Sequence, residues 1–243
     1  MSESTNRALA WVTDLRAEMW CVTFTHGITP EDVLARYGAD TSAAQFFTRQ
    51  HADQLHHGSL PEGSVLRAGA LGDWSFCFED NGVMGAMPGP LAALSQGTET
   101  LSVLQGGDGM NTFAQWRDGQ CTEQFEPGFA HTRPAPPHPW WDTVHERLDA
   151  SKEEHPGLAP VLEAVADHIS AVLDLHILNG PLLTLLLEDS NRAFGPRRAG
   201  AAPQPPGRIL GCPTVSGPPS PPATRSKRNP PITQHTYGTK TGQ

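Results

Sequence analysis

The chain of 243 residues concentrates all six tryptophans, all nine phenylalanines and all 26 acidic residues in residues 1–195. Because only ten basic residues accompany them, this part carries a formal charge of −16, which repels phosphate backbones and anionic lipid headgroups. The charge therefore argues against nucleic acid and membranes as partners.

Residues 196–243 have a different composition, with 11 prolines, seven basic residues and no acidic residue. Such a stretch has too few large apolar side chains to offset the entropy lost on ordering. We therefore predict one folded domain over residues 1–195 and a disordered, Pro-rich basic tail over residues 196–243. The abrupt change of composition also permits a frameshifted reading of the tail.

Several features favour a reduced, cytoplasmic protein. Residues 1–10 lack a basic stretch followed by an apolar one, and no run of 18 apolar residues occurs, so we expect neither a secretory signal nor a membrane span. The four cysteines occur singly, without the C-x-x-C spacing of zinc sites. Cys21 and Cys77 lie within apolar runs and are expected to be buried.

The first elements have clear local signals. Trp20–Thr25 is aromatic and β-branched, which predicts a strand. Thr29 is a suitable N-cap, Pro30 suits the first helical position and Gly38 supplies a stop, so a helix is predicted between them. Residues 43–57 are polar and rich in histidine, and they favour a helix only weakly.

The middle of the chain predicts strands, turns and one short helix. A helix is expected over Pro90–Gln96 and a strand around Leu101 to Val103. Two hairpins are expected because glycine-containing pairs separate apolar runs. Their strands are Val65–Leu71 with Trp74–Glu79, around Gly72-Asp73, and Thr112–Trp116 with Cys121–Phe125, around Asp118-Gly119.

The last third is expected to be helical. Apolar residues recur at helical spacing over residues 158–173, after a first helix over residues 142–151 and before a short apolar segment over residues 182–187. Strands followed by helices predict the α+β class. The expected fold is an antiparallel sheet of roughly five or six strands, with short helices packed on one face and a helical C-terminal third.

Short motifs occur in a fixed order from about residue 8 to about residue 190, and this order resembles a family of actinobacterial, Streptomyces-type domains of unknown function. The resemblance implies no known activity. The motifs are Trp20-Cys21-Val22-Thr23-Phe24, Glu79-Asp80-Asn81-Gly82, Ala93-Leu94-Ser95-Gln96-Gly97-Thr98, a hairpin and Phe125-Glu126-Pro127.

No local motif points to catalysis, a metal or a cofactor. No serine has the G-x-S-x-G setting of a nucleophile elbow. The glycine run at residues 106–109 precedes a strand and lacks the lysine of a phosphate loop. His145 with Glu146 does not match H-E-x-x-H. We therefore expect no catalytic residue, no metal ligand and no cofactor, and no small-molecule substrate can be named.

Paired carboxylates are the one feature that suggests a site. Glu79 and Asp80 close a predicted strand before the turn residue Asn81, and Glu126 ends another strand. If these strand ends are neighbours, the three carboxylates form an acidic cluster beside Asn81, suited to acid–base chemistry or able to receive a basic partner or a cation. The alternative is that they are solvated turn residues of an acidic domain.

Two functional hypotheses of different class follow. The first is a non-catalytic, acidic interaction or regulatory module, including the immunity-like kind, whose partner is another protein. The second is a hydrolase or transferase whose site assembles scattered carboxylates and histidines. A deep pocket with carboxylates of perturbed pKa favours the enzyme, whereas a flat acidic or aromatic patch favours the module.

Deleting residues 196–243 should leave the midpoint of thermal unfolding unchanged to within a few degrees, because the tail has no apolar cluster to pack on the domain. Calorimetry of the full and shortened chains measures this. A larger drop would show that the tail contributes to the folded core.

Overall fold

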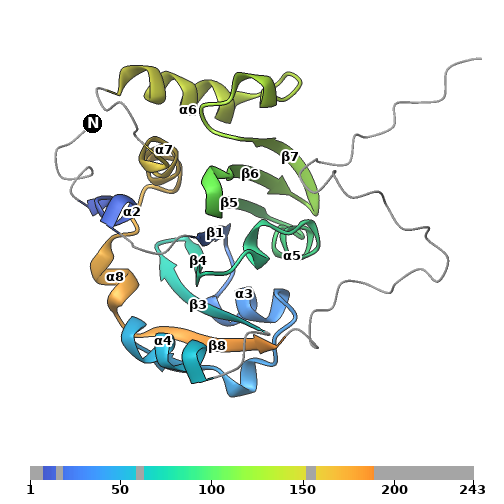
Figure 1. Ribbon diagram of the computed structural model, residues 1–243. Coiled ribbons are helices and arrows are strands. Elements are labelled where there is room, and N and C mark those ends of the chain that lie inside the picture. Colours follow the sequence, from blue (N-terminus) through green and yellow to red (C-terminus); the bar gives the residue numbers. More distant parts are fainter. Residues whose placement is uncertain (1–7, 15–18, 59–62, 152–156, 189–243) are drawn as a thin grey trace, which may run out of the picture. The chain divides into compact units, whose positions relative to one another are not determined.

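The structure is a computed structural model that describes residues 8–14, 19–58, 63–151 and 157–188 (Figure 1). The predicted tail lies outside the described residues, so its disorder and its boundary remain predictions. No helix among the described residues is long and apolar enough to cross a membrane.

The described residues form one antiparallel sheet of eight strands, in the order β2-β8-β3-β4-β1-β5-β6-β7. The α+β class and the antiparallel pairing agree with the sequence analysis, but the expected five or six strands were too few. The strands are β1 Trp20–His26, β2 Gln45–Phe47, β3 Gly63–Leu71, β4 Trp74–Asp80, β5 Glu99–Gln105, β6 Asn111–Arg117, β7 Gln120–Phe125 and β8 Leu182–Glu188.

The two additional strands, β2 and β8, are neighbours in the sheet. β8 occupies the segment that was expected to be helical. Its sequence does not indicate a strand, because leucine favours helices and the run shows no polar alternation. β8 pairs with β2 on one side and with β3 on the other. Leu183 and Leu182 face opposite sides of the sheet and both are buried, and a strand covered on both faces needs no alternation.

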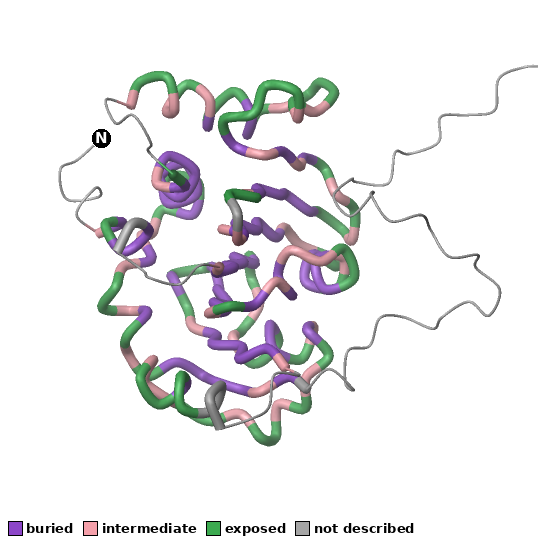
Figure 2. Tube along the Cα trace, viewed as in Figure 1, coloured by how far each residue is buried: buried purple, intermediate pink, exposed green. Residues whose placement is uncertain are grey.

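Helices cover both faces of the sheet, which corrects the expectation that they pack on one face (Figures 1 and 2). Val22 and Phe78 face α2, α6, α7 and α8, whereas Cys77 on the opposite face packs with α3 and α5. The helices are α2 Trp11–Asp14, α3 Pro30–Arg36, α4 Arg49–Gly58, α5 Pro88–Leu94, α6 Pro139–Ala150, α7 Ala159–Ile169 and α8 Leu175–Asn179.

Two local predictions are realised at the level of single residues. The side chain of Thr29 accepts a hydrogen bond from the backbone N–H of Asp32, whose carboxylate accepts one in return from the Thr29 N–H, and together they cap α3. Asp118 and Gly119 have φ angles of 49° and 76°, as the tight turn between β6 and β7 requires.

The side chain of an arginine in the sheet is buried. Arg67 of β3 is 1% exposed and donates hydrogen bonds to the carbonyls of Leu178 (2.7 Å) and Gly180 (3.1 Å), which attaches the end of α8 to the sheet. Burial lowers the pKa of Arg67 to about 10, so the guanidinium still carries its charge at neutral pH.

Candidate functional site

Glu79, the first of the predicted site residues, is fully buried. Its two carboxylate oxygens accept hydrogen bonds from the backbone N–H groups of Met84 (3.0 Å) and Gly85 (2.6 Å). A side chain at Gly82 would collide with Glu79. The glutamate and the glycine of the E-D-N-G turn are therefore explained by the packing of the loop after β4.

The next two residues of this turn, Asp80 and Asn81, also have structural roles. Asp80 forms a two-point ion pair with Arg49 of α4, at 2.6 and 3.1 Å, and both side chains are largely buried. The Arg49 guanidinium also lies 5.9 Å from the centre of the Phe78 ring. Asn81 is exposed and adopts a φ angle of 56°, which asparagine tolerates better than most residues.

Glu126 lies at the same end of the sheet as Glu79 and Asp80 but not beside them. Trp20 of β1 pairs with both Asp80 and Gln105, which places these strand ends at one end of the sheet, and β7 also ends there. Strands β1, β5 and β6 separate β4 from β7. With neighbouring strands about 4.8 Å apart, the two positions are roughly 19 Å apart along the sheet. The predicted carboxylates therefore do not form one cluster.

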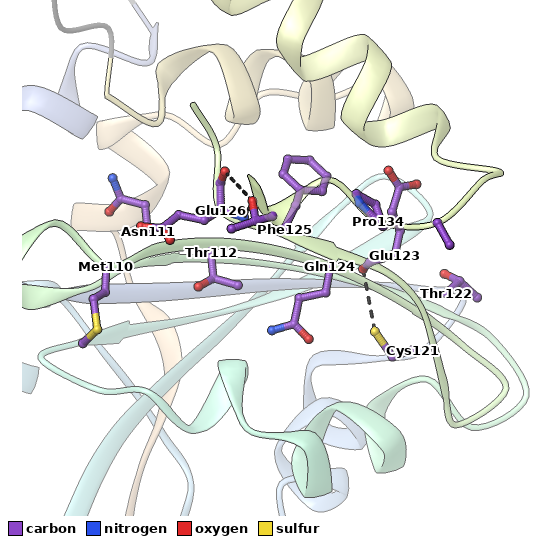
Figure 3. Close-up of a pocket in the computed structure, with 12 residues that line it drawn as sticks. Met110, Asn111, Thr112, Cys121, Thr122, Glu123, Gln124, Phe125, Glu126 and Pro134 are labelled. Atoms are coloured by element: carbon purple, nitrogen blue, oxygen red, sulfur yellow. Dashed lines mark hydrogen bonds between the residues drawn. The ribbon is translucent and has the colours of Figure 1, made fainter. Parts of the chain in front are cut away.

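Glu126 instead lines an open groove of about 530 Å³ along β7, the last strand of the described sheet (Figure 3). The start of β6 and the segment after β7 form the other walls. The lining residues are Met110, Asn111, Thr112, Cys121, Thr122, Glu123, Gln124, Phe125, Glu126, Thr132, Pro134 and Ala135.

The polar lining of the groove is rich in hydrogen-bond acceptors and contains no lysine, arginine or histidine. Glu126 is half-buried, and the Oδ1 atom of Asn111 is buried without a hydrogen-bond partner among the described residues. Because a buried acceptor without a donor is costly, the groove is suited to a ligand that donates hydrogen bonds or carries positive charge.

Glu123 of β7 lines the groove and also caps α6. Its carboxylate, on a residue only 3% exposed, accepts the backbone N–H groups of Trp140 (3.1 Å) and Trp141 (2.5 Å) in the first turn of the helix. Burial raises the pKa of Glu123, and it outweighs the opposing effects of the two backbone hydrogen bonds and of His138.

Large apolar side chains are exposed beside the groove. Met110, at its wall, is 58% exposed, and Phe129, on the segment that follows β7, is 48% exposed. The Phe129 N–H donates to the carbonyl of Glu126, which holds this segment near the end of the strand. Both side chains therefore add apolar surface at or beside the polar groove.

A second constellation, which the sequence analysis did not predict, lies at the opposite end of the sheet. The Nε2 atom of His168 in α7 is 3.4 Å from a carboxylate oxygen of Glu99 in β5, and the other oxygen accepts hydrogen bonds from Gln115 (2.5 Å) and Arg117 (3.1 Å). The His168 ring lies between Trp74 and Trp140, with centroid distances of 5.6 and 5.0 Å.

The ionised form of Glu99 is favoured in this setting. Burial acts to raise the pKa of Glu99, but hydrogen bonds from Gln115 and Arg117, with the charges of Arg117 and His168, outweigh it and hold the pKa below its usual value. Because 69 positions separate Glu99 from His168, no local motif could have revealed the pair. The described residues include no group of three or more histidine, cysteine, aspartate or glutamate side chains placed to hold a metal ion.

Replacing Glu79 by glutamine should lower the free energy of unfolding by about 1–3 kcal/mol, because the amide keeps one acceptor oxygen for two backbone N–H groups. Glu126→Gln is the matched control, and it should change stability by less than about 0.5 kcal/mol. Urea denaturation measures both variants. Equal losses would contradict the structural role assigned to Glu79.

Comparison with the curated proteins gave no match, and comparison with the solved structures gave none either. One family model matches residues 2–150, which is more than half of the chain and includes the whole groove. α7, α8 and β8 lie beyond the match. The chain therefore belongs to DUF6461, a family of unknown function.

Proposed function

We propose that this protein is a non-catalytic, acidic interaction module that binds an extended, basic segment of another protein in the groove along β7. The observation that carries the proposal is the lining of the groove, which contains the carboxylate of Glu126, the buried Oδ1 atom of Asn111 and no cationic side chain among the described residues. A segment rich in lysine or arginine complements this lining in both charge and hydrogen bonding.

The charge of residues 1–195 supports a basic partner. A formal charge of −16 attracts cationic segments over distances comparable to the Debye length and accelerates their association at low salt. Glu126 contributes a carboxylate at the groove itself, so the net charge of the domain and the local charge of the groove both favour a cationic segment. Charge complementarity of this kind favours fast association and excludes acidic partners.

The shape of the groove supports an extended occupant. Its lining includes the consecutive residues 121–126, and six residues of a strand span about 20 Å. This length suits a stretch of polypeptide better than a compact small molecule. Met110 and Phe129 add apolar surface beside the groove for the side chains of such a segment.

The raised pKa of Glu123 does not by itself indicate an enzyme. Its cause is burial, and both carboxylate oxygens are engaged by the first turn of α6. A catalytic base needs an oxygen directed at substrate, so the geometry favours a capping carboxylate over a proton-transfer group.

A second candidate function is a hydrolase that uses the pair formed by His168 and Glu99. A histidine oriented by a fixed carboxylate is the arrangement of a general base, and the His168 side chain is 35% exposed. Hydrolysis of p-nitrophenyl acetate above the buffer rate, lost in His168→Ala but kept in His131→Ala, would favour this candidate over the interaction module.

The peptide Ac-(Lys-Thr)4-NH2 should bind the protein at low salt, and Glu126→Gln should weaken the binding at least threefold because the groove loses a carboxylate. The same peptide with acetylated lysines keeps its length without its charge, and it should not bind. Isothermal titration calorimetry measures both affinities.

Glu31→Gln is the matched control, because it removes one carboxylate from an exposed position in the first turn of α3. This helix contacts β3, β4 and β8, which β1, β5 and β6 separate from β7. Its affinity for the lysine peptide should equal that of the wild type. If Glu31→Gln weakens binding as much as Glu126→Gln, the attraction is a property of the net charge and the groove is not the site.

A further inference from the structure

Cys121, which lines the groove from β7, is part of a disulfide bond. The chain contains four cysteines, and Cys21 and Cys77 are buried free thiols. The cysteine that remains to pair with Cys121 within the chain is Cys212, which lies outside the described residues. The expectation of a reduced protein is therefore wrong at Cys121, and the residues before Cys212 become a candidate occupant of the groove.

The connection from β8 starts at the end of the sheet from which the groove can be reached. β4 and β8 are both antiparallel to β3, so β8 ends at the same end of the sheet as β4, where Glu126 also lies. Five strands separate β8 from β7, which corresponds to roughly 29 Å. A flexible chain as long as the 24 positions from Glu188 to Cys212 spans about 27 Å, and a Pro-rich one spans more. The length therefore suffices for Cys212 to reach Cys121.

The direction of this connection brings opposite charges together. A segment that enters the groove at Glu126 and ends at Cys121 runs antiparallel to β7. At about 3.3 Å per residue on both chains, Arg208, four positions before Cys212, lies beside the last residue of β7 and Glu126. The described groove lining has a carboxylate in Glu126 but no cationic side chain, so Arg208 supplies the complementary charge.

The same segment also matches the groove in its apolar groups. Ile209 and Leu210 follow Arg208 directly and are among the few large apolar residues of the tail. Met110, at the groove wall, and Phe129, beside it, are 58% and 48% exposed. Covering these exposed side chains with Ile209 and Leu210 removes apolar surface from water and favours occupancy.

We propose that residues 207–212 of the same chain occupy the groove while Cys212 is joined to Cys121, and that Arg208 there binds Glu126. The segment then competes with the basic partner for the same carboxylate, so the disulfide closes the groove and its reduction opens it. This regulation rests on the proposed function, whereas the disulfide itself does not.

The switch needs one redox step. Each of the two thiols gives up a proton and an electron, and a small-molecule disulfide such as oxidised glutathione takes up both pairs and becomes two thiols. A dithiol such as dithiothreitol reverses the step. Because the bond closes a long loop, it also stabilises the folded chain. The unchanged unfolding midpoint expected on deletion of residues 196–243 therefore applies to the reduced chain.

Titration calorimetry of the full chain with Ac-(Lys-Thr)4-NH2 tests the competition in two redox states. These are prepared with oxidised glutathione or with dithiothreitol, each of which is then removed. We expect the oxidised chain to bind the peptide at least tenfold more weakly, because the tethered segment is present at high effective concentration. Cys212→Ser should bind like the reduced wild type after either treatment, and Arg208→Gln should reduce the difference between the two states.

Peptide mapping of the unreduced chain by mass spectrometry should give a fragment that joins Cys121 to Cys212, and the same spectra confirm that no glutathione stays attached. Absence of that fragment, or equal and measurable affinity in the two redox states, would overturn this inference and leave the proposed function intact. Absence of binding in both states would instead overturn the proposed function. The wild type alone supplies these comparisons, so the test does not depend on the folding of a variant.

Discussion

Helices cover both faces of the sheet, and this burial limits the positions at which a polar side chain can be accommodated without an internal partner. A polar group on a buried strand must find its partners inside the protein. Arg67 donates to main-chain carbonyls, Thr25 and Thr100 join across β1 and β5 at 3.1 Å, and Glu79 accepts from the loop after β4. Internal bonding therefore occupies the body of the sheet. Polar side chains that a partner could reach therefore lie at the strand ends and at the β7 edge, where the groove is.

The carboxylates show how environment assigns different roles to one type of side chain. Glu79 is fixed by two backbone N–H groups, Asp80 by an arginine, and Glu99 by an amide and an arginine that favour its ionised form. Glu123 is buried against a helix start, where burial disfavours its charge. Glu126 differs because it is half-buried and lines the groove. Of the carboxylates in the predicted site, it is the one that lines the groove.

Local signals predicted what local physics decides. The capping pattern that starts at Thr29 and the turn at Asp118-Gly119 depend on residues within four positions, and both form as expected. β8 could not be recognised in this way, because its leucine run acquires a strand conformation only from neighbours far away in the sequence. The groove and the pair formed by Glu99 and His168 likewise depend on the register of the strands and on where the helices pack. Short local patterns in the sequence predict neither.

The family match and the sheet divide the chain differently. β8 lies beyond residue 150 yet pairs with both β2 and β3, and Arg67 finds its acceptors in the residues just before β8. Without this segment, β3 has an open edge and β2 has no partner in the described sheet. The groove lies at the opposite edge, within the matched residues. The binding surface proposed here therefore belongs to the part of the chain that defines the family, while the remainder completes the sheet from the other side.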